Sequence, residues 1–148
     1  MNFLWKWMTL VAAVLVAIVG CGRADLVERE YAETASLRAD GVFDRGWVSP
    51  ALPAGAKQIK LATNLDTNEA WLRFSVAEGD LGGLARVCPS AEARAQDLPR
   101  VAAGSWWPGE LVEGGFKPNA FKYFRCSDGG VFASSPKDGL MYFWRRQS

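Results

Sequence analysis

The sequence predicts an α+β fold: a small antiparallel sheet with one or two helices packed on one face, preceded by an N-terminal signal or anchor helix. Apolar and polar residues alternate over residues 69–76, as in a strand. Aromatic runs near the C-terminus are separated by Asp-Gly turns, as in hairpins. The length of 148 residues, with 49% hydrophobic and 22% charged residues, suits a single globular domain and excludes a disordered chain.

The N-terminal segment predicts export. Residues Met8–Val19 (MTLVAAVLVAIV) form an apolar run that contains one polar side chain and follows Lys6. This arrangement is typical of a secretory signal peptide, here residues 1–20. The run is shorter than the roughly 20 residues that a membrane span needs. Extending it back through Phe3 leaves an uncleaved anchor as the alternative.

The end of this run predicts a lipid anchor. Ile18-Val19-Gly20-Cys21 resembles the bacterial lipobox. The resemblance implies that the Cys21 thiol receives a diacylglycerol, that the signal is cut before it, and that the new amino group is acylated, for example with palmitate. The alternative is an ordinary buried cysteine. Because Gly22 stands where an Asp tends to retain such proteins in the inner membrane, we expect the periplasmic face of the outer membrane.

Residues 21–45 are predicted to be the lipidated cysteine followed by a short polar helix or tether. Leu26, Tyr31 and Leu37 form a weak helical stripe, and Asp25 before Glu28 suits a capping box. The high charge of this stretch indicates a solvated helix face, with a partner-binding helix as the alternative.

Residues 46–148 are predicted to be the α+β domain. Residues 54–62 allow either one or two helical turns or a strand, and residues 64–68 are rich in turn formers. In the strand over 69–76, Ala70, Leu72, Phe74 and Val76 share one face, opposite Trp71, Arg73 and Ser75. A helix is expected before Pro89 and a second from Ser90 through Leu98, followed by a loop over 99–120.

Three strands are expected to close the chain: 121–126, 131–133 and 140–145. In the last one, Leu140, Tyr142 and Trp144 share one face, while Met141 and Phe143 share the other. The following Arg145-Arg146 is expected to be a solvated end.

The three cysteines divide into one lipidated residue and one pair. With Cys21 acylated, Cys88 and Cys126 remain, and in an oxidising periplasm they are predicted to form a disulfide. The enclosed loop predicts about 4 kcal/mol of stabilisation. A reactive thiol is disfavoured because the chain has no C-x-x-C motif and no His.

The composition excludes several function classes. Without His there is no His-based acid–base pair, Ser-His-Asp triad or His-containing metal site. Removal of residues 1–20 takes away one lysine and no acid, so the remaining side chains have no net charge and nucleic-acid binding is not expected. The oxygen-rich segment 66–69 breaks the pattern of an EF-hand loop and is expected to be a polar turn. No cofactor and no metal site are predicted.

Enzymatic activity is not expected. Carboxylates that could serve a hydrolase are present, but no spacing selects a pair: Asp44, Glu69, Asp80, Glu110 and Glu113. The candidate partner-binding residues are Trp106 and Trp107, which lie between glycines and prolines and could bind sugar, peptidoglycan or a protein. For both, anchoring of a loop to the core is the favoured interpretation, and partner binding is the alternative.

Several short motifs resemble a known family. Arg45-Gly46-Trp47-Val48-Ser49-Pro50, Leu52-Pro53-Ala54-Gly55-Ala56 with Ile59, and Asp66-Thr67-Asn68 are similar to motifs of small bacterial lipoproteins of the YbbD type. The similarity covers about residues 21–80 and the closing aromatic strand. Two departures are the spacing at Ser49-Pro50 and Gly55 in place of a serine. The resemblance implies a periplasmic lipoprotein domain without catalytic residues.

These observations predict a membrane-anchored periplasmic lipoprotein that serves as a non-enzymatic binding or structural module of the cell envelope. Its expected partners are the membrane, through the acyl chains on Cys21, and an envelope protein or peptidoglycan. An alternative is an inhibitor or immunity-type lipoprotein that blocks a cell-wall hydrolase. A hydrolase that uses carboxylates is a third hypothesis.

Overall fold

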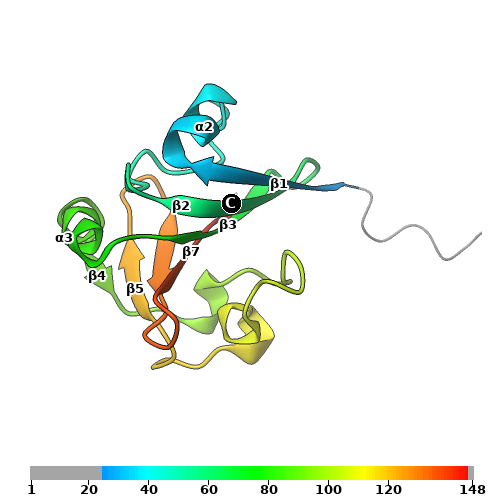
Figure 1. Cartoon of the computed structure of the whole chain (residues 1–148). Coiled ribbons are helices and arrows are strands. Elements are labelled where there is room, and N and C mark those ends of the chain that lie inside the picture. Colours follow the sequence, from blue (N-terminus) through cyan, green and yellow to red (C-terminus); the bar gives the residue numbers. More distant parts are fainter. Residues whose placement is uncertain (1–24, 147–148) are drawn as a thin grey trace, which may run out of the picture.

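The computed structural model describes residues 25–146 (Figure 1), so the predicted signal segment and Cys21 lie outside the described residues. Within this range the chain forms seven strands, two α-helices and three short 3₁₀ helices. The strands are β1 (Leu26–Glu33), β2 (Lys57–Asn64), β3 (Glu69–Ser75), β4 (Ser90–Ala91), β5 (Lys122–Arg125), β6 (Val131–Ser134) and β7 (Leu140–Arg145). The helices are α2 (Thr34–Ala39), α3 (Glu78–Val87), η1 (Ala95–Asp97), η2 (Gly109–Leu111) and η3 (Glu113–Gly115).

The strands of the described range form one antiparallel sheet in the order β1-β2-β3-β7-β6-β5-β4. The predicted alternation in β3 and β7 is confirmed, because Leu72 and Phe74 pack with Met141 and Phe143 on one face. On the other face Trp71 packs in the same cluster as Trp144. Residues 25–146 therefore form a mostly β structure, a seven-stranded antiparallel sheet with two α-helices, which is consistent with the α+β prediction.

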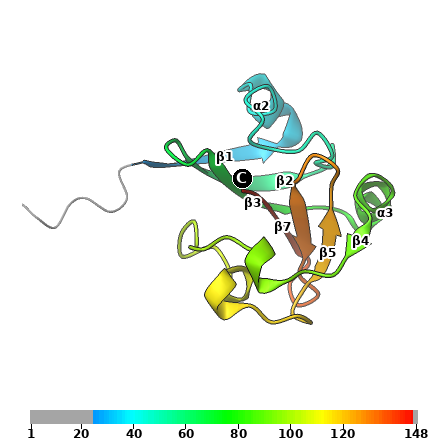
Figure 2. The ribbon, with the colours of Figure 1, turned by 180° about the vertical axis from the view of Figure 1, so that it is seen from behind.

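Each face of the sheet is covered by a different layer. On the first face, Leu37 of α2 and Leu84 of α3 are buried with the strand residues, together with Val48 and Leu52 from the segment that joins α2 to β2. We call this the helix-side core. On the second face, the long segment that joins β4 to β5 buries Leu98 and other residues against the sheet, and we call this the loop-side core. Figure 2 shows the two layers from behind.

The prediction of a polar helix or tether over residues 22–45 is wrong for residues 26–33, which form β1. A charged strand is stable here because β1 lies at the edge of the sheet and pairs only with β2. Polar side chains of β1 also form ion pairs and hydrogen bonds. Glu30 Oε1 lies 3.4 Å from Lys60 Nζ, and the Tyr31 hydroxyl donates a hydrogen bond to the Asp40 carboxylate. Residues 26–45 therefore belong to the same folded unit as the rest of the described chain.

The predicted helix from Ser90 through Leu98 is also wrong. Ser90–Ala91 forms β4 beside β5, and only the single turn η1 follows. The bond between Cys88 and Cys126 holds the start of this segment next to the end of β5, so residues 90–91 extend the sheet instead of starting a helix. The helix expected before Pro89 is α3, and burial of Leu84 outweighs the low helix propensity of its three glycines.

Among the residues that the structure describes, no helix has the length and apolar character required to cross a membrane.

Candidate functional site

The two adjacent tryptophans of the predicted binding site have different environments. Trp107 is only 4% exposed and lies in the loop-side core. Its ring packs edge-on against Tyr142, with centroids 5.5 Å apart, and its indole N–H donates a hydrogen bond to the Leu111 carbonyl at 2.9 Å. The interpretation of Trp107 as a partner-binding residue is therefore wrong, because this side chain anchors the loop to the sheet.

Trp106 lies at the surface and is half-buried. Its indole N–H donates a hydrogen bond to Glu28 of β1 at 3.0 Å, across 78 positions of sequence. The ring is also close to two cations, with Lys60 Nζ 5.7 Å and the Arg73 guanidinium carbon 5.8 Å from the ring centroid. These contacts fix the ring over β1, β2 and β3, at the margin of the segment that covers the loop-side core.

A glycine allows this close approach. A Cβ atom at position 104 would lie 3.0 Å from both Glu28 Oε1 and Trp106 Nε1. Since such contacts are tighter than ordinary packing, the backbone at Gly104 can pass beside the Trp106–Glu28 hydrogen bond only without a side chain.

Two like charges lie side by side beneath Trp106. Lys60 of β2 and Arg73 of β3 are directly opposite in the antiparallel register, an arrangement that destabilises a sheet unless it is neutralised. Glu30 lies opposite Lys60 on β1, and Lys60 Nζ is 3.4 Å from Glu30 Oε1 and 3.9 Å from Glu28 Oε2. Within residues 25–146, Arg73 forms no ion pair.

A shallow hollow adjoins these charges. It has a volume of about 480 Å³ and is lined by residues of the first three strands, among them Glu30, Gln58, Lys60 and Arg73. Gln58 of β2 has a φ of 52°, and it lies between Lys57 and Lys60, where the pairing of β2 with β3 is irregular, so the strand backbone is displaced there. We define the Trp106 surface as Glu28, Glu30, Lys60, Arg73 and Trp106.

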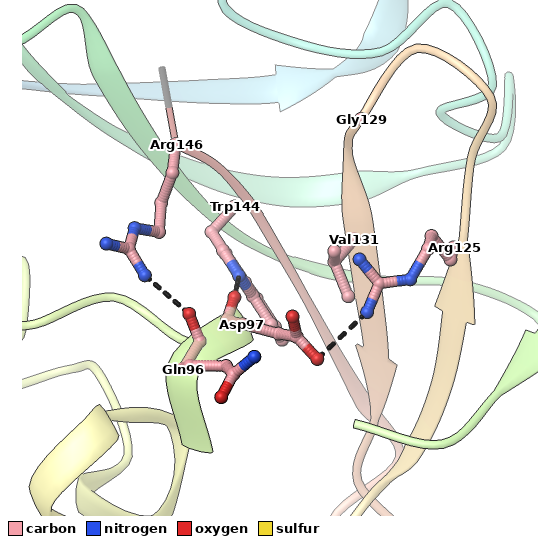
Figure 3. A pocket seen from close by; sticks show the side chains of 7 residues that line it. All are labelled: Gln96, Asp97, Arg125, Gly129, Val131, Trp144 and Arg146. Atoms are coloured by element: carbon pink, nitrogen blue, oxygen red, sulfur yellow. Dashed lines mark hydrogen bonds and ion pairs between the residues drawn. The ribbon is translucent and has the colours of Figure 1, made fainter. Parts of the chain in front are cut away.

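A second hollow, of about 270 Å³, lies between η1 and the ends of β5 and β7 (Figure 3). The Trp144 indole donates a hydrogen bond to the Asp97 carbonyl at 2.8 Å, and the Arg146 guanidinium donates to the Gln96 carbonyl at 2.6 Å. The Asp97 carboxylate lies 3.1 Å from the Arg125 guanidinium. These polar groups bind each other, so the hollow fastens η1 to the sheet.

The contacts in this second hollow lower the pKa of the Asp97 carboxyl. Burial raises the pKa of the Asp97 carboxyl, but hydrogen bonds from Arg94 and the charge of Arg125 outweigh burial and hold the pKa below its usual value. The expectation of a solvated Arg145-Arg146 end is wrong, because Arg146 binds backbone carbonyls and Arg145 pairs with Asp128 and with the Gly46 carbonyl.

The predicted cysteine pair lies at the junction of α3 and β5. The Sγ atoms of Cys88 and Cys126 are 2.03 Å apart, at disulfide distance, and both residues are buried in the helix-side core. The bond joins the end of α3 to the strand that follows the long loop, so it closes the part of the chain that carries Trp106 and Trp107.

The carboxylates do not assemble into a metal-binding group. Within the described residues no three carboxylate or cysteine side chains are grouped as metal ligands. One close carboxyl pair was not foreseen: the hydrogen bond and the charge of Asp66 raise the pKa of Asp25. The two residues lie 41 positions apart, and only the β1–β2 pairing of Leu26 with Asn64 brings them together.

Sequence patterns pointed to Trp106 but not to its neighbours on the surface. Arg73 was placed on the correct strand face, opposite Leu72 and Phe74, yet nothing in the sequence showed that a loop residue would lie over it. Lys60 and Glu28 were missed because residues 54–62 were interpreted as either helical turns or a strand, and residues 22–45 as a polar helix or tether. Cys21, the predicted lipidation site, lies outside the described residues.

Comparison with known proteins supports the resemblance noted in the sequence. Residues 25–75 match the family model described as the YbbD head domain, which supports a YbbD-type domain in this part of the chain. The matched range includes β1, α2, β2 and β3, and therefore Glu28, Lys60 and Arg73, whereas Trp106 lies beyond it. A search of curated proteins and a search of solved structures found no match.

Proposed function

We propose that the chain is a membrane-anchored lipoprotein of the periplasm, on the outer membrane, whose domain binds another component of the cell envelope without catalysing a reaction. The lipobox-like Ile18–Cys21 segment supports the anchor, and the Cys88–Cys126 pair suits an oxidising compartment. The match of residues 25–75 to the YbbD head domain is consistent with this assignment.

The observation that carries the binding role is a fixed, half-buried Trp106 beside Arg73, which forms no ion pair with any residue from 25 to 146. An aromatic ring held by a hydrogen bond and two cations loses little conformational entropy when a ligand packs on it. The Arg73 guanidinium can bind an anionic group of the ligand without first losing an ion pair to a described residue. Both features suit an envelope component that carries a carboxylate beside an apolar or sugar-like face.

The role of the Trp106 surface is tested with single substitutions in the mature domain. Trp106→Ala and Arg73→Gln should each reduce the amount of ligand that the domain captures from solubilised envelope. Both substitutions should also reduce the amount of the domain that binds to purified peptidoglycan. Arg86→Gln is the matched control. Arg86 is an exposed arginine of α3, and this helix packs on the face of the sheet opposite the Trp106 surface. Equal capture by all three variants would place the binding surface elsewhere.

The anchor is tested separately. Cys21→Ala should abolish metabolic labelling with palmitate and leave the chain either uncleaved or released from the membrane. Labelling that persists in Cys21→Ala would contradict the lipid anchor without bearing on the Trp106 surface.

A further inference from the structure

Three large hydrophobic residues are exposed in the described part of the chain, and two of them lie at the same end of the fold. Leu65 is 57% exposed, Val101 is 61% exposed, and the third, Val87, is 64% exposed at the end of α3. The Leu65 N–H donates a hydrogen bond to the Asp25 carbonyl at 3.1 Å. Val101 and Asp25 line one hollow of about 290 Å³. Leu65 and Val101 therefore both adjoin Asp25.

The turn that carries Leu65 is held in place. The Asn64 side-chain oxygen accepts hydrogen bonds from the N–H groups of Asp66 and Thr67 at 3.0 and 3.1 Å. At the far side of the turn, the Trp47 indole donates to the Asn68 side-chain oxygen at 2.6 Å. Because the backbone is fixed at both ends of the turn, Leu65 remains at the surface rather than folding back onto the core.

The chain length before Asp25 places this end close to the anchor. Four residue steps separate Cys21 from Asp25, and a fully extended chain covers at most about 14 Å in four steps. The acyl chains on Cys21 must lie in the hydrocarbon core, and the polar headgroup layer beyond that core is only about 5–8 Å thick on each side. The end of the domain at Asp25 is thus confined to the surface of the bilayer.

We propose that Leu65 and Val101 form a membrane-contacting tip that rests in the lipid interface when Cys21 is acylated. This inference depends on the lipid anchor of the proposed function. The contact depends on the apolar side chains and not on charge attraction. Asp25 and Asp66 lie at the same end, and their carboxylates would be repelled by anionic lipid. The β2–β3 turn and the loop around residue 101 then face the membrane, and α3 with β4, at the opposite end in Figures 1 and 2, faces away from it.

The tip is tested with the lipidated chain in vesicles of phosphatidylethanolamine and phosphatidylcholine, which carry no net charge. Leu65→Cys and Val101→Cys each provide a single thiol for an environment-sensitive fluorophore, since Cys21 carries the lipid in the lipidated chain and Cys88 and Cys126 are bonded to each other. Val87→Cys is the matched control, because it is equally exposed at the opposite end. On reconstitution the emission of labels at 65 and 101 should shift to shorter wavelength and be quenched by nitroxide-bearing lipid. The label at 87 should be unaffected.

Each other outcome overturns the tip in a recognisable way. If the protein floats with the vesicles but all three labels behave alike, the tip is wrong and the anchor stands. If the protein does not float with the vesicles, or if palmitate labelling persists in Cys21→Ala, the anchor fails and the tip fails with it. If the shift at 65 and 101 appears without lipid and grows with protein concentration, the residues contact a second copy of the chain instead.

Discussion

Replacing Trp107 by alanine should destabilise the fold far more than replacing its neighbour Trp106. Trp107 is 4% exposed and forms edge-on contacts with Tyr142 and Trp144, whose ring centroids lie 5.5 and 6.1 Å away. Its indole N–H also donates a hydrogen bond to the Leu111 carbonyl at 2.9 Å. The substitution leaves a cavity beneath the loop and an unpaired carbonyl beside it.

The magnitude follows from these contacts. Truncation of a buried tryptophan costs about 3–5 kcal/mol of the free energy of unfolding. For a domain of this size each kcal/mol lowers the melting temperature by about 4 °C, so Trp107→Ala should lower it by about 12–20 °C. Trp106→Ala removes one hydrogen bond and two cation–π contacts at the surface, and should cost about 1–2 kcal/mol.

Thermal unfolding followed by circular dichroism, with urea unfolding as a second measurement, distinguishes the two variants. Trp107→Phe adds a control, because it keeps most of the ring packing but removes the N–H donor, and its melting temperature should lie between those of the wild type and Trp107→Ala. Equal melting temperatures for Trp106→Ala and Trp107→Ala would refute the assignment of Trp107 to the core. Binding experiments should therefore use Trp106→Ala alone, since a double variant would confound binding with unfolding.

Three further substitutions test other parts of the fold. Replacing Cys88 and Cys126 together by alanine should lower the free energy of unfolding by about 4 kcal/mol, and urea unfolding should show the same loss for the reduced wild type but no further loss when the double variant is reduced. The pKa of Asp97 lies below its usual 3.8, so the ionised carboxylate stabilises the fold above pH 3.8 and this stabilisation is lost as the pH falls. Asp97→Asn should therefore lower the free energy of unfolding at neutral pH and reduce its dependence on pH in acid, both measured by urea unfolding. An unchanged pH dependence would argue against this role. Gly115→Ala should cost about 1–3 kcal/mol in thermal unfolding, because its Cβ would overlap a backbone carbonyl, whereas Gly114→Ala, with open space around it, should stay close to the wild type.

The strands that lie inside the sheet could be predicted from sequence, while its edges could not. β3 and β7 are flanked by strands on both sides and covered on both faces, so burial imposes a regular alternation on residues 69–75 and 140–145. β1 has one neighbouring strand and an open edge, so its charged residues Glu28, Arg29 and Glu30 carry no strand signal. β4 is only two residues long, and its position depends on the bond between Cys88 and Cys126.

The candidate site shows a similar division. The sequence indicated Trp106 because an aromatic pair between glycines and prolines is unusual, but it did not show which of the two rings would be buried. The hydrogen bond from Trp106 to Glu28 spans 78 positions, and the opposition of Lys60 and Arg73 depends on strand register. Contacts at such separations arise from the folded topology and have no local pattern to predict them.

The direction of β1 determines how the domain resists a pull on its N-terminal end. A force applied at Asp25 and opposed at the far side of the sheet acts along the strand, so the β1–β2 hydrogen bonds between Leu26 and Glu33 share the load simultaneously. A strand pulled at right angles to its length would instead break these bonds one after another. Under such a pull β1 would act as a mechanical clamp between Asp25 and the rest of the sheet.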